Sequence, residues 1–104
     1  MRKIIVSIAV LSTAVAAAPA SAKTTTVDAF NFGFGKAKID KGDKVKWKST
    51  DGDHDVTFKG GINFSQKVDE GDTTSAAKFP DSGTFKYICK IHKSEGMKGK
   101  VKVK

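Results

Sequence analysis

Three side chains that can bind a soft metal ion lie within nine residues near the end of the chain. They are the thiol of Cys89, the imidazole of His92 and the thioether of Met97. The sequence holds one other histidine, His54, and no second cysteine. Two imidazoles and a thiolate in a trigonal plane, with a weak thioether on the axis, form the ligand set of a blue-copper electron-transfer site. The residue types therefore predict one copper ion per chain, with His54, Cys89, His92 and Met97 as its metal ligands.

The spacing within this loop strengthens the prediction. Taken singly, each residue has a simpler interpretation: Cys89 as an inert buried thiol, Met97 as a core side chain and His54 as a surface residue. Jointly, the pattern Cys-x2-His-x4-Met before the last predicted strand is a specific arrangement of three scarce residue types. Cu(I) favours soft sulfur and Cu(II) favours imidazole nitrogen, so one such site suits both oxidation states. The pattern therefore favours a protein that passes single electrons.

Three other functions could use the same side chains. A copper-trafficking or copper-buffering protein would bind Cu(I) and pass it on, but such proteins favour clusters of exposed methionines, and this chain has two methionines. An enzyme would use Cys89 as a nucleophile with His92 or His54 as its base, yet the sequence offers no third group to orient that base. Zinc accepts thiolate and imidazole but suits a thioether poorly. We therefore expect an electron carrier and not an enzyme, with copper trafficking or buffering as the alternative.

Apolar and polar residues alternate with period two after residue 22, and no segment of convincing length has a helical period. Phe85, Tyr87 and Cys89 form one such apolar row, so the thiol of Cys89 should point inward at its end. Turns rich in Gly and Asp separate the short strands about every ten residues. We predict strands near 25–32, 36–40, 43–49, 54–59, 63–68, 73–79, 84–89 and 98–103. This pattern indicates an all-β fold, a Greek-key β-sandwich of seven to eight strands.

The first 22 residues are typical of an export signal. Arg2 and Lys3 precede an uncharged run over residues 4–21, and the small residues Ala20-Ser21-Ala22 end the segment. A positive start, an apolar run and small residues before the cut are the three parts of a secretory signal peptide. The run is also short for a membrane-spanning helix. We therefore predict a signal peptide at 1–22, one domain at 23–104, a periplasmic location and no membrane span.

The predicted mature domain owes its positive charge to lysine alone. Without Arg2 and Lys3, the 19 basic residues become 17 lysines, against 11 acidic residues and no arginine. Proteins that read nucleic acids normally use the planar guanidinium of arginine. The composition therefore argues against a nucleic-acid partner.

The motifs together resemble one protein family. The chain is similar to a small cupredoxin of the plastocyanin, pseudoazurin and amicyanin group over the whole predicted domain. The resemblance implies a Greek-key sandwich with copper at one end, bound at the positions of His54, Cys89, His92 and Met97. The gap of four residues between His92 and Met97 is that of plastocyanin and pseudoazurin. The segments that carry the resemblance are residues 42–47, 54–56, 79 and 83–89, together with His92, Gly96-Met97 and Gly99-Lys100-Val101.

Two positions depart from the family pattern. The residue after the first ligand is usually Asn, whose backbone amide steadies the cysteine sulfur and whose side chain ties two loops together; here it is Asp55. The backbone donor survives this change, and the added negative charge should favour Cu(II). The residue before the cysteine, an exposed tyrosine used for docking in plant plastocyanins, is Ile88.

The same resemblance implies how the protein would meet its partners. In similar cupredoxins the exposed edge of the histidine at the position of His92 serves as the electron port. Lys90, Lys93 and Lys98 lie around His92 in the sequence, and their positive field would steer an acidic protein face onto that port. We therefore expect a monomer that exchanges electrons with a redox protein donor and a redox protein acceptor, each with an acidic docking face.

Overall fold

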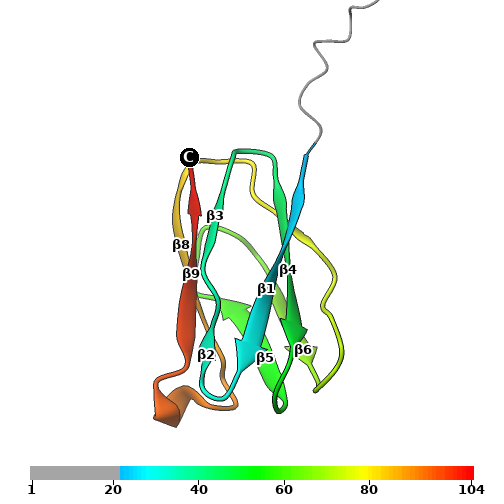
Figure 1. Ribbon diagram of the computed structural model, residues 1–104. Coiled ribbons are helices and arrows are strands. Elements are labelled where there is room, and N and C mark those ends of the chain that lie inside the picture. The colour runs from blue at the N-terminus through cyan, green and yellow to red at the C-terminus, as the bar shows by residue number, and fades with distance from the viewer. Residues whose placement is uncertain (1–21) are drawn as a thin grey trace, which may run out of the picture.

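Nine strands form two sheets that pack face to face (Figure 1). The computed structural model describes residues 22–104, so the predicted signal peptide lies outside the described residues except for Ala22. Within this described part, no helix is long and apolar enough to cross a membrane. The predicted all-β sandwich is confirmed.

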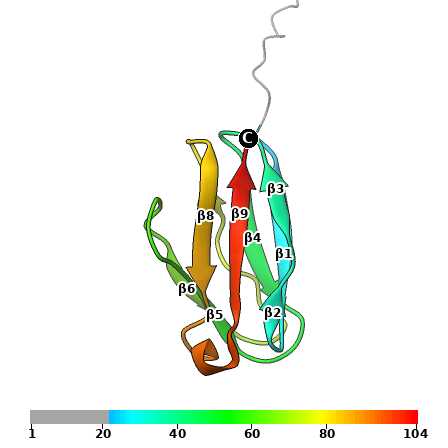
Figure 2. The ribbon, with the colours of Figure 1, turned by 90° about the vertical axis from the view of Figure 1, so that its left-hand side faces the viewer.

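Each sheet combines strands that are distant in the sequence (Figures 1 and 2). The four-stranded sheet has the order β2-β1-β4-β7, and the five-stranded sheet has the order β3-β9-β8-β5-β6. Parallel pairing joins β1 to β4 and β3 to β9, whereas the other neighbours are antiparallel. The strands are β1 Thr24–Phe30, β2 Gly33–Phe34, β3 Ala37–Ile39, β4 Lys44–Ser49, β5 His54–Phe58, β6 Ser65–Val68, β7 Ala77–Lys78, β8 Gly83–Ile88 and β9 Lys98–Val103, and the 3₁₀ turn η3, Lys93–Glu95, lies between β8 and β9.

Strict alternation decides which side of each strand faces the core. In β4, Val45 and Trp47 are buried while Lys44 and Lys48 are exposed. The strand β9 repeats the arrangement, with its valines inside and its lysines outside. Successive side chains of a strand point to opposite faces, so each of these strands has one apolar face and one wet face. Two such sheets bury their apolar faces against each other and form the core.

Trp47 lies at the centre of that core. Its ring centroid is 5.3 Å from those of Tyr87 and Phe64 and 5.7 Å from that of Phe58. Aromatic pairs in tilted and edge-to-face arrangements stabilise a fold by about 0.5–1.5 kcal/mol beyond the burial of their area. Burial raises the pKa of Tyr87 to about 12, so its phenol stays neutral. The aromatic core holds β4, β5 and β8 together. Loops at one end of the sandwich begin or end at these strands.

Two segments differ from the predicted strands. The expected strand 25–32 extended through Phe32, but the chain turns after Phe30 and returns as β2. Asn31, a residue that favours turns, stands at that point. The expected strand 73–79 is reduced to β7, because the Thr74 hydroxyl replaces a backbone carbonyl and accepts the amide N–H of Trp47. The amide of Thr74 still donates to the Trp47 carbonyl, so the segment stays attached without forming a regular ladder.

The carboxylate of Asp43 ties the start of β1 to the turn before β4. Its two oxygens accept the backbone N–H groups of Lys23 and Asp40, each over 3.1 Å. These two donors hold the pKa of Asp43 below its ordinary value. A carboxyl group whose pKa is lowered by folding stabilises the fold above the pKa of the unfolded chain, and this contribution is lost as the pH falls.

We therefore expect Asp43→Asn to unfold at a lower urea concentration than the parent at neutral pH. The difference should begin to shrink below about pH 4, where the carboxylate of the unfolded chain becomes protonated, and should vanish as the pH falls through the lower pKa of the folded carboxylate. Urea titrations of both proteins at neutral and acidic pH measure this directly. A difference of the same size at both pH values would contradict the assigned role of the carboxylate.

The loops at one end of the sandwich hold the residues that could do chemistry. In Figure 1 the β8–β9 loop, the β1–β2 turn and the β4–β5 loop all lie at the lower end, away from the C-terminus. These loops come from both sheets. The two packed sheets therefore set the distances between side chains that are far apart in the sequence.

Candidate metal centre

His54 opens β5 and is oriented by the loop before it. Its Nε2 lies 2.6 Å from the backbone carbonyl of Asp51, and a carbonyl only accepts hydrogen bonds. Nε2 therefore carries the proton and donates it, which leaves the lone pair of Nδ1 in the neutral ring free for a metal. Ser49 closes this loop by donating its hydroxyl to the carbonyl of Gly52. The φ of Gly52 is 81°, in the left-handed region that glycine tolerates best.

Cys89 follows β8 and points inward, as the alternation predicted. The residue is fully buried. The backbone amide of Asp55 donates to Sγ over 3.5 Å, and the amide of Cys89 itself donates to the carbonyl of Met97 over 3.1 Å. The first contact is the one that the family resemblance implied for the residue after His54. It points the positive end of an N–H dipole at the sulfur and holds this atom in place as a metal ligand.

His92 and Met97 lie on the β8–β9 loop, which η3 tightens. The amide of Met97 donates to the carbonyl of His92, and the intervening Gly96 ends the turn with a φ of 74°. Met97 is then 1% exposed and packs with Cys89 and Ala29 in a small apolar cluster. The loop thus places Met97 beside Cys89, while the ring of His92 stays half-buried.

Three donor atoms converge although they come from two separate loops. The Nδ1 atoms of His54 and His92 are 3.2 Å apart, and Sγ of Cys89 lies 4.0 Å from the first and 3.8 Å from the second. Metal–nitrogen distances of about 2.0–2.1 Å and a metal–sulfur distance of about 2.3 Å fit one ion close to the plane of this triangle. The donor set of two imidazoles and one thiolate is also the one copper prefers. The structure therefore brings together the residues that the sequence selected, and they fit a copper ion.

Asp55 joins the two loops that carry the donors. Its Oδ1 accepts the backbone N–H of Lys90 over 2.7 Å, which links β5 to the residue that follows Cys89. The side chain is 9% exposed. Asp55 therefore makes both contacts expected of the usual asparagine: its backbone amide donates to the cysteine sulfur, and its carboxylate links the two loops. The carboxylate also adds a negative charge near the donor atoms.

Exposed apolar side chains lie at the same end of the sandwich as His92, and the sequence patterns did not single them out. The ring of Phe32 is 4.9 Å from that of His92, with the planes inclined by 60°. Phe30, Phe32 and Ile91 are 39%, 49% and 46% exposed. The predicted strand 25–32 ran through Phe32, so the turn that carries Phe32 to the histidine was missed. An exposed aromatic ring therefore lies against the half-buried imidazole.

A family comparison agrees with this geometry. The family described as copper-binding proteins of the plastocyanin/azurin family matches residues 19–104. The chain is a cupredoxin. Copper is the metal of this family, and His54, Cys89, His92 and Met97 are arranged in this cupredoxin as in a blue copper site. Among curated protein sequences, none matches the chain.

Solved structures of three cupredoxins have the same fold. An amicyanin variant in its oxidised state is 27% identical, with a TM-score of 0.64, over 86% of this chain and 89% of its own. Oxidised plastocyanin from Dryopteris crassirhizoma is 22% identical, with a TM-score of 0.65, over 77% of this chain and 100% of its own. A purple cupredoxin from Nitrosopumilus maritimus is 20% identical, with a TM-score of 0.64, over 77% and 99%. The β-sandwich of this cupredoxin is therefore that of its family.

Proposed function

We propose that this cupredoxin carries single electrons between larger redox proteins outside the cytoplasm. The observation that carries the proposal is the triangle of donor atoms from His54, Cys89 and His92, with Met97 buried beside it. All four residues are the proposed metal ligands. When bound there, copper supplies a one-electron couple between Cu(I) and Cu(II).

The restraints on the donor atoms suit electron transfer. The Asp51 carbonyl orients His54, and the Asp55 amide holds the sulfur of Cys89. Donors that are braced by strands stay in place when the charge of the metal changes, so little rearrangement accompanies the electron. Cys89 and Met97 are both buried, which keeps substrates from the thiol, and among residues 22–104 no thioether is exposed from which copper could be passed on. These features favour a carrier over an enzyme or a trafficking protein.

His92 is the proposed point of electron exit. It is the half-buried member of the donor triangle, whereas His54 and Cys89 are fully buried. Exposed Phe32 and Ile91 stand beside it, and an apolar surface lets a partner approach without removing bound water from charged groups.

Voltammetry combined with copper transfer separates a carrier from a trafficking protein. For a carrier we expect a reversible one-electron wave from the copper-loaded protein. We also expect the copper to stay bound while an added Cu(I) chelator of moderate affinity is present. Rapid loss of Cu(I) to that chelator, without a reversible wave, would support a copper-trafficking protein and contradict the proposed electron carrier.

Substitutions of Met97 should move the reduction potential in opposite directions. Met97→Gln supplies a harder oxygen donor that favours Cu(II), so the potential should fall; Met97→Leu removes the donor, so it should rise. A tenfold change in the preference for one oxidation state corresponds to about 59 mV, and we expect each shift to be of that order. Voltammetry of the three proteins gives the answer. Shifts in the reverse order would contradict Met97 as the axial ligand.

We further propose that the chain is exported and cleaved after Ala22. The cut would turn the backbone nitrogen of Lys23, now an amide that donates to Asp43, into a charged amine 3.1 Å from that carboxylate. A charge-assisted hydrogen bond is stronger than a neutral one and would anchor the new N-terminus to the fold. The intact mass of the protein recovered from the periplasm tests the cleavage site. A mature chain that starts at any residue other than Lys23 would contradict it.

The docking partner of the His92 end is proposed to be an acidic protein face. Lys90 and Lys93 are exposed on the loop that carries His92. Their field is screened over a Debye length of about 8–10 Å near physiological salt. Electron transfer to the native acceptor should therefore slow as the ionic strength rises. Stopped-flow kinetics should show that the double variant Lys90→Glu, Lys93→Glu transfers electrons about tenfold more slowly than the parent at low salt.

A matched control separates steering at this loop from the effect of net charge. Lys44 and Lys78 pair across β4 and β7 on the opposite sheet, and both are exposed. The double variant Lys44→Glu, Lys78→Glu changes the net charge equally and should transfer electrons at nearly the parent rate. Equal slowing in both double variants would show that the loop lysines have no specific docking role. An unchanged visible spectrum would show that the copper site is intact in each variant.

A further inference from the structure

The outer face of the five-stranded sheet is covered by lysine. On β3, β8 and β9 the exposed charged side chains are all positive, and none of these three strands contains an acidic residue. Strand register places Lys38 opposite Lys102 and Lys86 opposite Lys100. Together with two neighbours that line the same surface, these side chains form what we call the lysine face: Lys36, Lys38, Lys59, Lys86, Lys98, Lys100 and Lys102.

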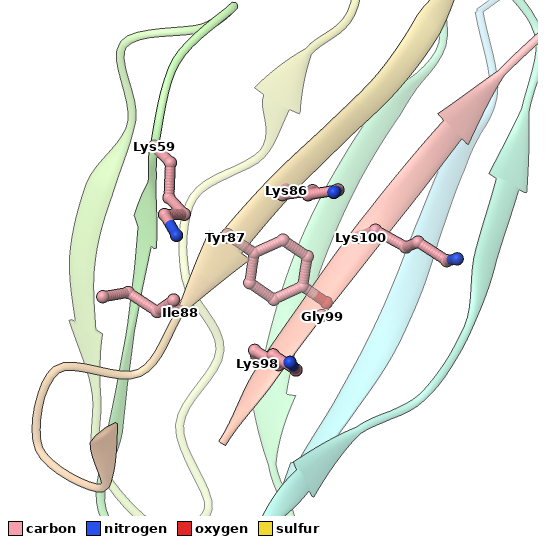
Figure 3. A pocket seen from close by; sticks show the side chains of 7 residues that line it. All are labelled: Lys59, Lys86, Tyr87, Ile88, Lys98, Gly99 and Lys100. Carbon is pink, nitrogen blue, oxygen red and sulfur yellow. The ribbon is translucent and has the colours of Figure 1, made fainter. Parts of the chain in front are cut away.

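Two depressions hollow the lysine face. The larger has a volume of about 470 Å³, and its charged lining consists of Lys59, Lys86, Lys98 and Lys100. Figure 3 shows these four side chains together with the ring of Tyr87, which reaches from β8 toward β9 and is buried on the core side of the sheet. The second depression, of about 350 Å³, is lined by lysines of β3 and β9 and their neighbour Lys36.

Charge balance distinguishes these two depressions from a third. The third has a volume of about 310 Å³ and lies near the start of β1, where Asp40 and Asp43 stand among three lysines. In the part of the chain that the structure describes, the one ion pair joins Lys67 to Asp69, and neither residue belongs to the lysine face. The positive charges of the face are therefore not neutralised by neighbours. Like charges on adjacent strands repel one another, so their fields add and an anionic partner would relieve the repulsion.

We propose that the lysine face docks an acidic surface of a partner protein. Charge complementarity selects an acidic partner, and the two concave depressions suit protruding carboxylate side chains. A lipid surface is flat, and a protein that binds it usually inserts large apolar side chains. In this cupredoxin the exposed Phe30, Phe32 and Ile91 lie at the end of β1, in the β1–β2 turn and in the β8–β9 loop, and not on the lysine face.

The position of the lysine face gives the docked partner a second approach to the metal-binding end. Ile88 lines the larger depression and is joined to Cys89 by one peptide bond. The face is distinct from the Lys90 and Lys93 pair on the loop of His92. Docking here goes beyond the proposed electron transfer, because the binding of an acidic surface does not require copper.

Nuclear magnetic resonance with an acidic polymer tests the proposal. We would titrate the reduced, copper-loaded protein, labelled with ¹⁵N, with poly-L-glutamate at low ionic strength. The largest shift changes should fall on backbone amides of β3, β8 and β9. The double variant Lys86→Gln, Lys100→Gln removes one facing pair of exposed lysines and should weaken binding about fivefold or more.

The control removes an equivalent pair from the other sheet. Lys44 and Lys78 also face each other across antiparallel strands, and Lys44→Gln, Lys78→Gln should change the affinity by less than about twofold. Equal weakening in both double variants, or shift changes spread over both sheets, would overturn the proposal. Binding to vesicles of phosphatidylglycerol and phosphatidylcholine, without binding to poly-L-glutamate, would overturn it in favour of a lipid surface. If the copper-loaded protein is blue but does not bind poly-L-glutamate as predicted, only the docking proposal for the lysine face is wrong. If it binds as predicted but is colourless with copper, only the electron-transfer proposal is wrong.

Discussion

Replacing Cys89 by serine should abolish the visible colour of the copper-loaded protein. The intense blue of such a site comes from charge transfer between a thiolate and Cu(II), and it is strong when the sulfur lies in the plane of the other donors. Cys89 is the one cysteine of the chain, and its Sγ completes a triangle with the Nδ1 atoms of His54 and His92. A hydroxyl is a harder and more weakly acidic donor, so Cys89→Ser would keep the shape of the site and lose essentially all of the band.

Absorption spectra of the parent and of Cys89→Ser after loading with Cu(II) measure this effect. Met97→Leu provides the matched control, because it alters a buried sulfur residue of the same cluster but leaves the thiolate in place and should stay coloured. Circular dichroism would establish that both variants keep the β-sandwich. A serine variant as blue as the parent would show that Cys89 is not the source of the colour.

Gly99→Ala should cause a large loss of stability. Gly99 lies opposite Tyr87 in the ladder between β8 and β9, and its inward side is filled by the tyrosine ring. A Cβ atom added at Gly99 would lie 2.5 Å from both Cζ and the hydroxyl oxygen of Tyr87. The ring cannot move aside, because it is fully buried against Trp47 and Phe34. Forced overpacking of this kind costs about 1–3 kcal/mol and occasionally more.

Thermal unfolding measures the cost, and a loss of about 2–3 kcal/mol lowers the melting temperature of a domain this small by about 10–20 °C. Gly60→Ala is the matched control, because an added Cβ there meets no atom within 4 Å. It should change stability by no more than about 0.5 kcal/mol. If Gly99→Ala unfolds at the parent temperature, the ring of Tyr87 is not packed against that strand.

Local patterns in the sequence were enough to predict most of the strands and the direction of Cys89. Side chains alternate with period two along a strand, so the apolar row that contains Tyr87 predicts which residues of β8 face the core without knowledge of any contact. The ligand residues were predictable for a different reason. Cysteine, histidine and methionine are scarce in this chain, and a metal site accounts for their close spacing in one loop better than chance does.

Contacts between distant segments could not be predicted in the same way. The approach of His54 to His92 spans 38 residues and depends on how β5 pairs with β8. The contact between the rings of Phe32 and His92 depends on a turn inside the segment that was predicted as one strand, 25–32. The lysine face likewise depends on register, because a shift of one residue would turn the lysines of β9 into the core. Pairing and register are properties of the whole sandwich, and only the structure reveals them.

We expect one copper ion to bind at His54, Cys89, His92 and Met97 and to cycle between two oxidation states. Titration of the purified domain with Cu(II), followed by visible absorption, tests it most directly. We predict an intense blue band that saturates at one equivalent of copper, disappears on reduction with ascorbate and returns on reoxidation. Copper that binds without colour, or a band that keeps growing beyond one equivalent, would contradict it.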